Sequence, residues 1–326
     1  MSFDLPLVFA AIMGGAILLY VLFDGYDLGI GMLMPAASAE EQELMVASIG
    51  PFWDANETWL VLGVGVLLAA FPLAHGIVLG ALYLPVVAML VGLMIRGVAF
   101  EFRMKARGTH RALWNRLFSL GSLLAAFSQG WMLARYVTGF ADEPAYVLFA
   151  FLVGAGLCGG YVLIGATWLI LKTEGAVQQK ALRWARIGLI AVGIGIAMVS
   201  IATPVVSETV RERWFTFPRT FALMLLPAAT LGTGLWLWRE TRVAGRGDWR
   251  PFAGAVAIFV LAFAGLAYSL FPYLVLDRLT LRDAAAHPSA LRFILVGVAV
   301  VLPFLLAYTV YAHRVFRGKV REPLYE

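Results

Sequence analysis

Charged residues are scarce in this sequence. Asp, Glu, Lys and Arg make up only 14% of its 326 residues, whereas soluble domains contain about 25% of these residue types. The hydrophobic share is 61%, and long apolar runs follow one another along most of the chain. Because such runs are long enough to cross a bilayer as helices, the composition excludes an ordinary soluble domain. It predicts an all-α, polytopic membrane protein.

Cysteine and histidine are also rare. The single cysteine falls inside an apolar run, so neither an internal disulfide nor a cysteine metal cluster is expected. The four histidines lie in or beside the expected loops, where none is a convincing transmembrane haem ligand. They are His75, His110, His287 and His313. The sequence therefore predicts no metal site and no catalytic residue in this chain alone.

Nine apolar segments are expected to form membrane-spanning helices. Their approximate ranges are 5–34, 53–71, 77–98, 117–137, 145–171, 187–206, 220–238, 252–276 and 291–315. The second and third segments are separated by only a few residues, so merging these two is the main alternative count. No loop is long enough for a soluble domain, and no internal repeat is evident. Residues 1–326 are therefore expected to form one integral membrane domain.

The distribution of basic residues predicts the orientation in the membrane. With the N-terminus outside and the C-terminus cytoplasmic, 18 of the 25 Lys and Arg residues fall on the cytoplasmic side, as the positive-inside rule requires. These 18 include Arg246 and Arg321. The net charge of +5 therefore reflects topology and does not indicate a nucleic-acid partner. The first apolar run is too long for the core of a cleaved signal peptide, so the N-terminus is expected to stay on the protein.

One cytoplasmic loop departs from this charge rule. It follows the first span, carries no Lys or Arg and contains Glu40, Glu41 and Glu43. It is either a proton-collecting surface or simply a solvated loop.

Two carboxylates lie within the first expected span. Asp24 and Asp27 are three residues apart, so they project from similar faces of a helix. A charged acidic side chain at the bilayer centre costs about 2.5–3.5 kcal/mol, and such residues usually have a function. Gly25 and Gly29 allow a second helix to approach closely. The carboxylates are therefore expected to face protein, and the two glycines to line the partner interface or the core beside it.

The stretch PFWDANETWL at residues 51–60 carries two further carboxylates. Asp54 and Glu57 fall in the first turn of the second expected helix, near the positive end of its dipole. They either cap this helix at the membrane surface or begin a proton route. Such a route would continue to Asp24, deeper in the membrane.

Arginine and tryptophan side chains near these carboxylates also have two interpretations. Arg96 follows an apolar run and either reaches a carboxylate of the first two helices or extends to the interface, and extension is favoured for Arg103. Trp53 and Trp59 are either interfacial anchors or parts of the same site.

Four motifs, in this order, resemble subunit II of cytochrome bd-type quinol oxidases. They are DGYDLG at 24–29, PFWDANETWL at 51–60, RGVAFE at 96–101, and GATW at 165–168 followed by KTEG at 172–175. Their order, their spacing and the nine-span layout fit over essentially the whole chain. The short loops are similar to those of the cyanide-insensitive branch.

The resemblance implies a division of labour in the bacterial cytoplasmic membrane. A partner, subunit I, would carry haems b and d and the quinol-oxidising loop. The heterodimer, surrounded by membrane lipids, would oxidise quinol and reduce oxygen to water. A small accessory subunit and a structural quinone are left open.

The resemblance also assigns roles to individual residues. Asp54 and Asp24 match positions proposed for a cytoplasmic proton path, and Asp27 and Glu57 are the adjacent candidates. Trp53 matches a position near a bound quinone in some members of the family. For Arg96 two roles stay open: it either lies near the quinone or has a structural role.

Two other classes of function stay open from the sequence. An independent transporter with a carboxylate ion site would predict discontinuous helices and an internal repeat. A purely structural assembly subunit would carry the same carboxylates as inert, packed groups.

Overall fold

Helices form most of the chain in the computed structural model, which describes residues 4–242 and 248–320. Arg246 and Arg321 lie outside these described residues. Within them, seven helices are long and apolar enough to cross a membrane, and the chain is an all-α, polytopic membrane protein. The seven are α1 (Leu5–Leu33), α5 (Tyr83–Lys105), α6 (Gly108–Val137), α7 (Pro144–Lys172), α8 (Gly175–Val206), α12 (Trp249–Leu270) and α14 (Pro288–Val315).

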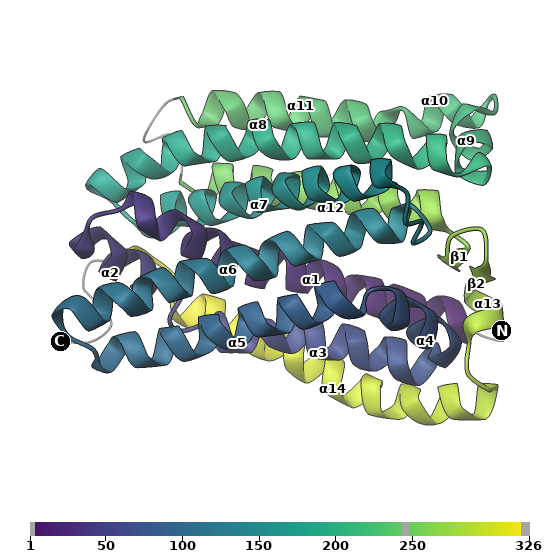
Figure 1. Cartoon of the computed structure of the whole chain (residues 1–326), viewed down its shortest axis with the longest axis horizontal. Coiled ribbons are helices and arrows are strands. Elements are labelled where there is room, and N and C mark those ends of the chain that lie inside the picture. Colours follow the sequence, from purple (N-terminus) through teal and green to yellow (C-terminus); the bar gives the residue numbers. More distant parts are fainter. Residues whose placement is uncertain (1–3, 243–247, 321–326) are drawn as a thin grey trace.

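Two more helices run alongside these seven (Figure 1). They are α3 (Trp53–Ala70) and α11 (Leu225–Glu240), and they coincide with the second and seventh expected spans. The polar first turn of α3 lowers its mean hydropathy, and α11 has only 16 residues. The count of nine spans therefore stays a prediction.

Prolines move two of the expected boundaries. The third expected span is divided, because α4 (Pro72–Ala81) is a separate short helix and α5 begins only after Leu82. Pro85 has no N–H to bond the carbonyl four residues earlier, which weakens a continuous helix at this point. The eighth expected span ends at Leu270 rather than at residue 276. The next residue, Phe271, precedes Pro272, and the helical conformation is disfavoured for a residue before proline.

The residues after α12 form a small hairpin instead of more helix. Strand β1 (Tyr273–Val275) pairs antiparallel with β2 (Leu279–Thr280). This hairpin lies at one end of the bundle with the short helices α9 (Glu208–Phe215), α10 (Arg219–Leu223) and α13 (Leu281–Ala284) (Figure 1). The start of α1 lies at this same end, and α14 finishes at the opposite end.

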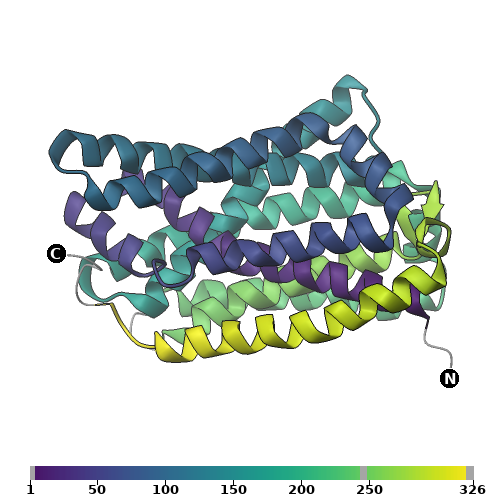
Figure 2. The same ribbon diagram turned by 90° about the horizontal axis from the view of Figure 1, so that it is seen from below.

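Helix α1 lies inside the bundle, with other helices packed around it. It packs against α3, α6 and α7 and also touches α12 and α14. In both views α14 lies along one edge, beside α3, while α8 and α11 form the opposite edge of Figure 1 (Figures 1 and 2). The second half of α1 is almost entirely buried. The carboxylates of the first motif are therefore shielded from lipid by protein.

The acidic loop after α1 is ordered into two short helices, η1 (Met34–Ala36) and α2 (Ala39–Ala47). Ser38 and Glu41 form a reciprocal capping box at the start of α2. Glu41 also accepts a hydrogen bond from Lys180 Nζ at 2.6 Å. The bond from Lys180, followed by the Ser38 backbone N–H, lowers the pKa of Glu41.

We expect the stability of α2 to depend on pH through Glu41. A lowered folded-state pKa stabilises the folded state above the unfolded pKa, and this stability is lost as pH falls through the folded-state value. In Glu41→Gln, amide hydrogens of residues 39–47 should exchange about twofold faster at neutral pH, as expected for a partly exposed ion pair. Hydrogen-exchange mass spectrometry of the purified protein measures this ratio. As the pH falls into the acid range, the ratio of the exchange rate in Glu41→Gln to that in the wild type should approach one. A ratio that does not change with pH would contradict the role of the ion pair.

Candidate functional site

A buried ion-pair cluster joins α1, α3 and α5. Its centre is Arg96, which is 0% exposed, as is Asp24. Arg96 Nη1 donates to Asp24 Oδ1 at 2.5 Å, and Nη2 donates to Glu57 Oε1. Arg96 therefore pairs with carboxylates from two other helices and does not extend to the membrane interface.

Asp27 belongs to the same region but has a neutral partner. Its Oδ2 accepts a hydrogen bond from Asn56 Nδ2 at 2.8 Å, and the same amide nitrogen lies 2.9 Å from the Tyr26 hydroxyl. In the described part of the chain no basic side chain lies within 4 Å of Asp27. Burial without a cation distinguishes Asp27 from Asp24.

The cluster has more potential negative charge than positive charge. Asp24, Asp27 and Glu57 can each ionise, whereas Arg96 supplies the one positive charge that pairs with them. An uncompensated charge buried in a low-dielectric interior is strongly unfavourable. In addition, Asp24 Oδ2, Asp27 Oδ1 and Arg96 Nε are buried without a hydrogen-bond partner among the described residues. Protons or water molecules can satisfy these atoms, so the arrangement is suited to holding an exchangeable proton.

Asp54 lies at the surface end of this cluster without touching its buried members. It is exposed in the first turn of α3, and Glu57, one turn further along, is half-buried. Side chains three positions apart on a helix are neighbours. A line of polar side chains therefore leads from the surface to Asp24, through Asp54, Glu57 and Arg96. The structure brings Asp24, Glu57 and Arg96 together directly, and Asp54 only through Glu57.

One expectation about a neighbouring side chain is wrong. Arg103 was expected to extend to the interface, but it is 1% exposed. It donates to Glu43 Oε1 and to Asn115 Oδ1, each at 2.8 Å, because α2 and the extended start of α6 cover it. Trp59 is buried, which favours the second of its two interpretations, a part of the same site, over an interfacial anchor. Trp53 is half-buried, with its ring centroid 4.7 Å from that of Phe100.

Gly25 and Gly29 pack inside the chain, against α7. A Cβ atom at Gly29 would lie 2.7 Å from the Tyr161 carbonyl carbon and 3.1 Å from Gly165 Cα, with the Tyr161 oxygen closer still. At Gly25 it would meet the Tyr161 ring at 2.8 Å. Of the two expected locations for these glycines, the structure therefore favours the core.

Sequence reasoning did not find several polar residues around the cluster. The Nε2 atom of His313 lies 3.4 Å from the Tyr26 hydroxyl, although the two residues are separated by 287 positions. Gln129 Nε2 donates to the Tyr20 hydroxyl at 2.9 Å, and Gln129 Oε1 accepts from Tyr161. Asn56 and Tyr26 lie inside recognised motifs, so these two gave a signal that could have been followed.

The histidines of the described residues do not fit a haem held within this chain. His75 and His287 lie near the N-terminal ends of α4 and α14, whereas His110 is exposed near the start of α6. His313, in the last turns of α14, is half-buried, and its Nδ1 lies 2.8 Å from the Thr309 carbonyl oxygen. None lies at the middle of a long helix, as an axial ligand of a haem inside the bilayer would. Among the described residues, no cluster of three His, Cys, Asp or Glu could hold a metal ion either.

Comparison with known proteins gives one consistent family. The family model described as "Cytochrome bd terminal oxidase subunit II" matches residues 5–316. The chain is 26% identical to "Cytochrome bd ubiquinol oxidase subunit 2" of Bacillus subtilis (strain 168), with 94% of each chain covered. It is also 26% identical to "Cytochrome bd-I ubiquinol oxidase subunit 2" of Escherichia coli (strain K12), with 92% of this chain and 91% of that protein covered.

The fold has also been seen in a solved structure. A chain of the bd oxidase from Geobacillus thermodenitrificans superposes with a TM-score of 0.79, covering 96% of this chain and 99% of that one. Sequence identity is 18%, so this likeness concerns the fold.

Proposed function

Because the chain belongs to the cytochrome bd terminal oxidase subunit II family, we propose that it supports a haem-bearing subunit I and provides that partner with a cytoplasmic proton path. The chain is a subunit of a respiratory terminal oxidase. In the proposed heterodimer, subunit I carries the haems and the quinol-oxidising site in the bacterial cytoplasmic membrane. A small accessory subunit is compatible with this arrangement.

The division of labour is supported by the donor set of this chain. The complex oxidises quinol and reduces oxygen to water, and haems supply the electron transfer and oxygen chemistry when they are bound. Since the histidines of the described residues do not fit a haem inside this chain, the proposal places the haems in the partner. What remains for this chain is to hold the partner and to move protons at its own carboxyl groups.

The proton path is supported most by one observation, a buried carboxyl group without a cation. Asp27 is 0% exposed and has a neutral amide as its partner. Protonation of Asp27 removes an uncompensated buried charge, so this group can accept and release a proton as the charge around it changes. Asp54 would collect protons at the surface, and Glu57 would receive them one helical turn further in.

Arg96 limits what Asp24 can do in this path. The guanidinium donates directly to Asp24, whereas the partner of Asp27 is a neutral amide. We therefore assign Asp24 the role of orienting Arg96, and Asp27 the role of the exchangeable site. The described carboxyl groups of the cluster form no direct carboxyl–carboxyl hydrogen bond. Water or small side-chain movements must therefore carry protons between them.

The proposal includes a structural quinone beside Trp53. The indole is half-buried and packs on Phe100, so part of its surface remains available for a flat apolar ring. Arg96 is fully engaged with carboxylates, which favours its structural role over contact with a quinone.

The purely structural alternative also has an observation in its favour, namely the direct pairing of Arg96 with two carboxylates. Asparagine substitutions separate the two functions, because an amide keeps the size and most of the hydrogen bonding of a carboxyl group but cannot carry a proton. We expect Asp54→Asn and Asp27→Asn to slow quinol oxidation by the assembled oxidase at least about tenfold, because lost general acid–base transfer typically costs about 10²-fold or more. Haem content should be unchanged.

Glu101→Gln is the matched control for Asp54→Asn, because Glu101 is an exposed carboxylate at the same end of the bundle. It should keep the wild-type rate. Full quinol oxidation and undiminished membrane potential in both asparagine variants would assign these residues a structural role only.

A further inference from the structure

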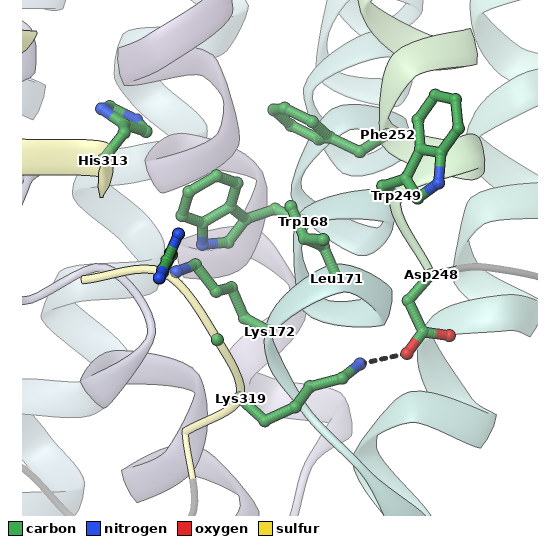
Figure 3. Close-up of a pocket in the computed structure, with 10 residues that line it drawn as sticks. Trp168, Leu171, Lys172, Asp248, Trp249, Phe252, His313 and Lys319 are labelled. Carbon is green, nitrogen blue, oxygen red and sulfur yellow. Dashed lines mark ion pairs between the residues drawn. The ribbon is translucent and has the colours of Figure 1, made fainter. Parts of the chain in front are cut away.

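A cavity of about 470 Å³ lies away from the carboxylate cluster, where the ends of α7 and α14 meet the start of α12. In Figure 3 the rings of Phe252 and Trp249 lie on one side, and the ion pair between Lys319 and Asp248 lies on the other. Its lining combines aromatic rings with basic groups. The aromatic residues are Trp168, Trp249 and Phe252, and the basic ones are Lys172, His313, Arg317 and Lys319.

Lys172 is a buried cation that pairs with no carboxylate of residues 4–242 and 248–320. The residue is 5% exposed, and its Nζ donates to the Phe316 carbonyl at 2.5 Å. Nζ also lies 5.1 Å from the Trp168 ring centroid and 5.6 Å from that of Phe52. No carboxylate lies within 4 Å of it in the described part of the chain. Buried charges are normally paired, and an ammonium has three donors, so Lys172 has unused capacity for an anion at the cavity.

The single acidic residue of the lining is already occupied. Asp248 pairs with Lys319 at 2.5 Å, and Lys319 also donates to the backbone oxygens of Ile170 and Thr173. Lys172 and Arg317 are therefore left without an acidic counterpart among the residues that line the cavity. The cavity has a surplus of positive charge even with His313 neutral.

We propose that this cavity binds the phosphate headgroup of an anionic glycerophospholipid. Basic pockets between membrane helices suit such headgroups, and tryptophans favour the depth of the lipid headgroups. Lys172 and Arg317 would hold the phosphate, while Trp168 and Phe252 would pack on the glycerol and the first part of an acyl chain. Trp249, which is 62% exposed, extends this apolar surface toward the lipid.

The volume and the position of the cavity agree with this ligand. A volume of about 470 Å³ is typical of a small-molecule site and leaves most of two acyl chains outside, in the membrane. The cavity lies at the end of the bundle where α14 finishes, and Arg317 is exposed at its mouth. A lipid can therefore enter from the surrounding leaflet.

The test uses the intact oxidase complex in nanodiscs containing equal parts of dioleoyl-phosphatidylglycerol and dioleoyl-phosphatidylcholine. Native mass spectrometry then measures which lipid stays bound after release from the disc. We expect the wild type to retain phosphatidylglycerol over phosphatidylcholine. Arg317→Gln should lower this retention about fivefold, which corresponds to about 1 kcal/mol for one basic residue at an anionic headgroup. Lys172→Gln, which can still donate to the Phe316 carbonyl, should lower it at least as much.

Arg314→Gln is the matched control, because Arg314 is exposed on the same end of α14 but does not line the cavity. It should retain phosphatidylglycerol like the wild type. Equal retention of the two lipids by the wild type, or unchanged retention in Arg317→Gln, would overturn the proposal. So would protection of the delipidated complex against heat by inorganic phosphate as strong as that by phosphatidylglycerol, because the site would then recognise free phosphate.

Discussion

Replacing Gly29 by leucine is expected to prevent the protein from reaching its folded, assembled state. Even a Cβ atom at this position would lie 2.7 Å from the Tyr161 carbonyl carbon, and that contact is with backbone. Backbone cannot rotate away as a flexible side chain can, so α1 and α7 would have to separate. Overpacking a buried site costs about 1–3 kcal/mol and occasionally more, and the Gly29 contact belongs to the upper end. The yield and the melting temperature of the purified complex measure the effect.

Gly29→Ala and Gly15→Ala make a matched pair for this prediction. Both glycines lie on α1, but a Cβ atom at Gly15 would meet nothing within 4 Å. We expect Gly29→Ala to lose most of the yield and Gly15→Ala to resemble the wild type. Normal yield and heat stability in Gly29→Leu would show that the approach of α1 to α7 does not depend on this glycine.

Replacing Arg96 by glutamine is expected to destabilise the complex strongly. The substitution leaves Asp24 fully buried and Glu57 partly buried without their cation. Removing one partner of a buried ion pair costs about 3–5 kcal/mol, mostly because the other charge stays buried and unpaired. We expect a large loss of assembled oxidase, measured as the amount of haem-containing complex relative to total membrane protein. Arg96→Lys should be intermediate, since one ammonium cannot reproduce the fork of a guanidinium.

A compensating variant separates charge from shape. Combining Arg96→Gln with Asp24→Asn and Glu57→Gln removes the unpaired charges and leaves side chains of similar size that can hydrogen-bond. Because replacing a whole buried ion pair is often close to neutral, this triple variant should recover much of the lost assembly. A triple variant as unstable as Arg96→Gln would show that the ion pairs are not the reason for the effect.

The sequence predicted the fold class and the main residues of the cluster for physical reasons. Carboxylates inside apolar helices are rare enough to stand out, so Asp24 and Asp27 could be recognised directly. Long apolar runs indicated most of the helices. Hydropathy does not show where a helix continues into water, however, and α6 and α8 begin before the expected spans, at Gly108 and Gly175.

The partners of buried polar groups could not be predicted in the same way. Whether an arginine at the end of an apolar run extends to the interface depends on what covers it. For Arg103 the cover comes from α2 and α6, which a single helix pattern does not show. His313 reaches Tyr26 only because the last long helix packs beside the first. Pro85 marked the possible break near Leu82, but Pro204 and Pro303 lie inside continuous helices, so a proline alone does not locate a break.

A measurement of proton uptake tests the assignment of Asp27 most directly. The reaction of the fully reduced, purified oxidase with oxygen can be followed with a pH-sensitive dye, with Asp27→Asn compared against the wild type and Glu101→Gln. The amide can still accept the hydrogen bond from Asn56, so folding and haem content should be preserved. We predict proton uptake at least about tenfold slower in Asp27→Asn and unchanged uptake in Glu101→Gln. Proton uptake at the wild-type rate in an Asp27→Asn oxidase with full haem content would contradict a proton path through this residue.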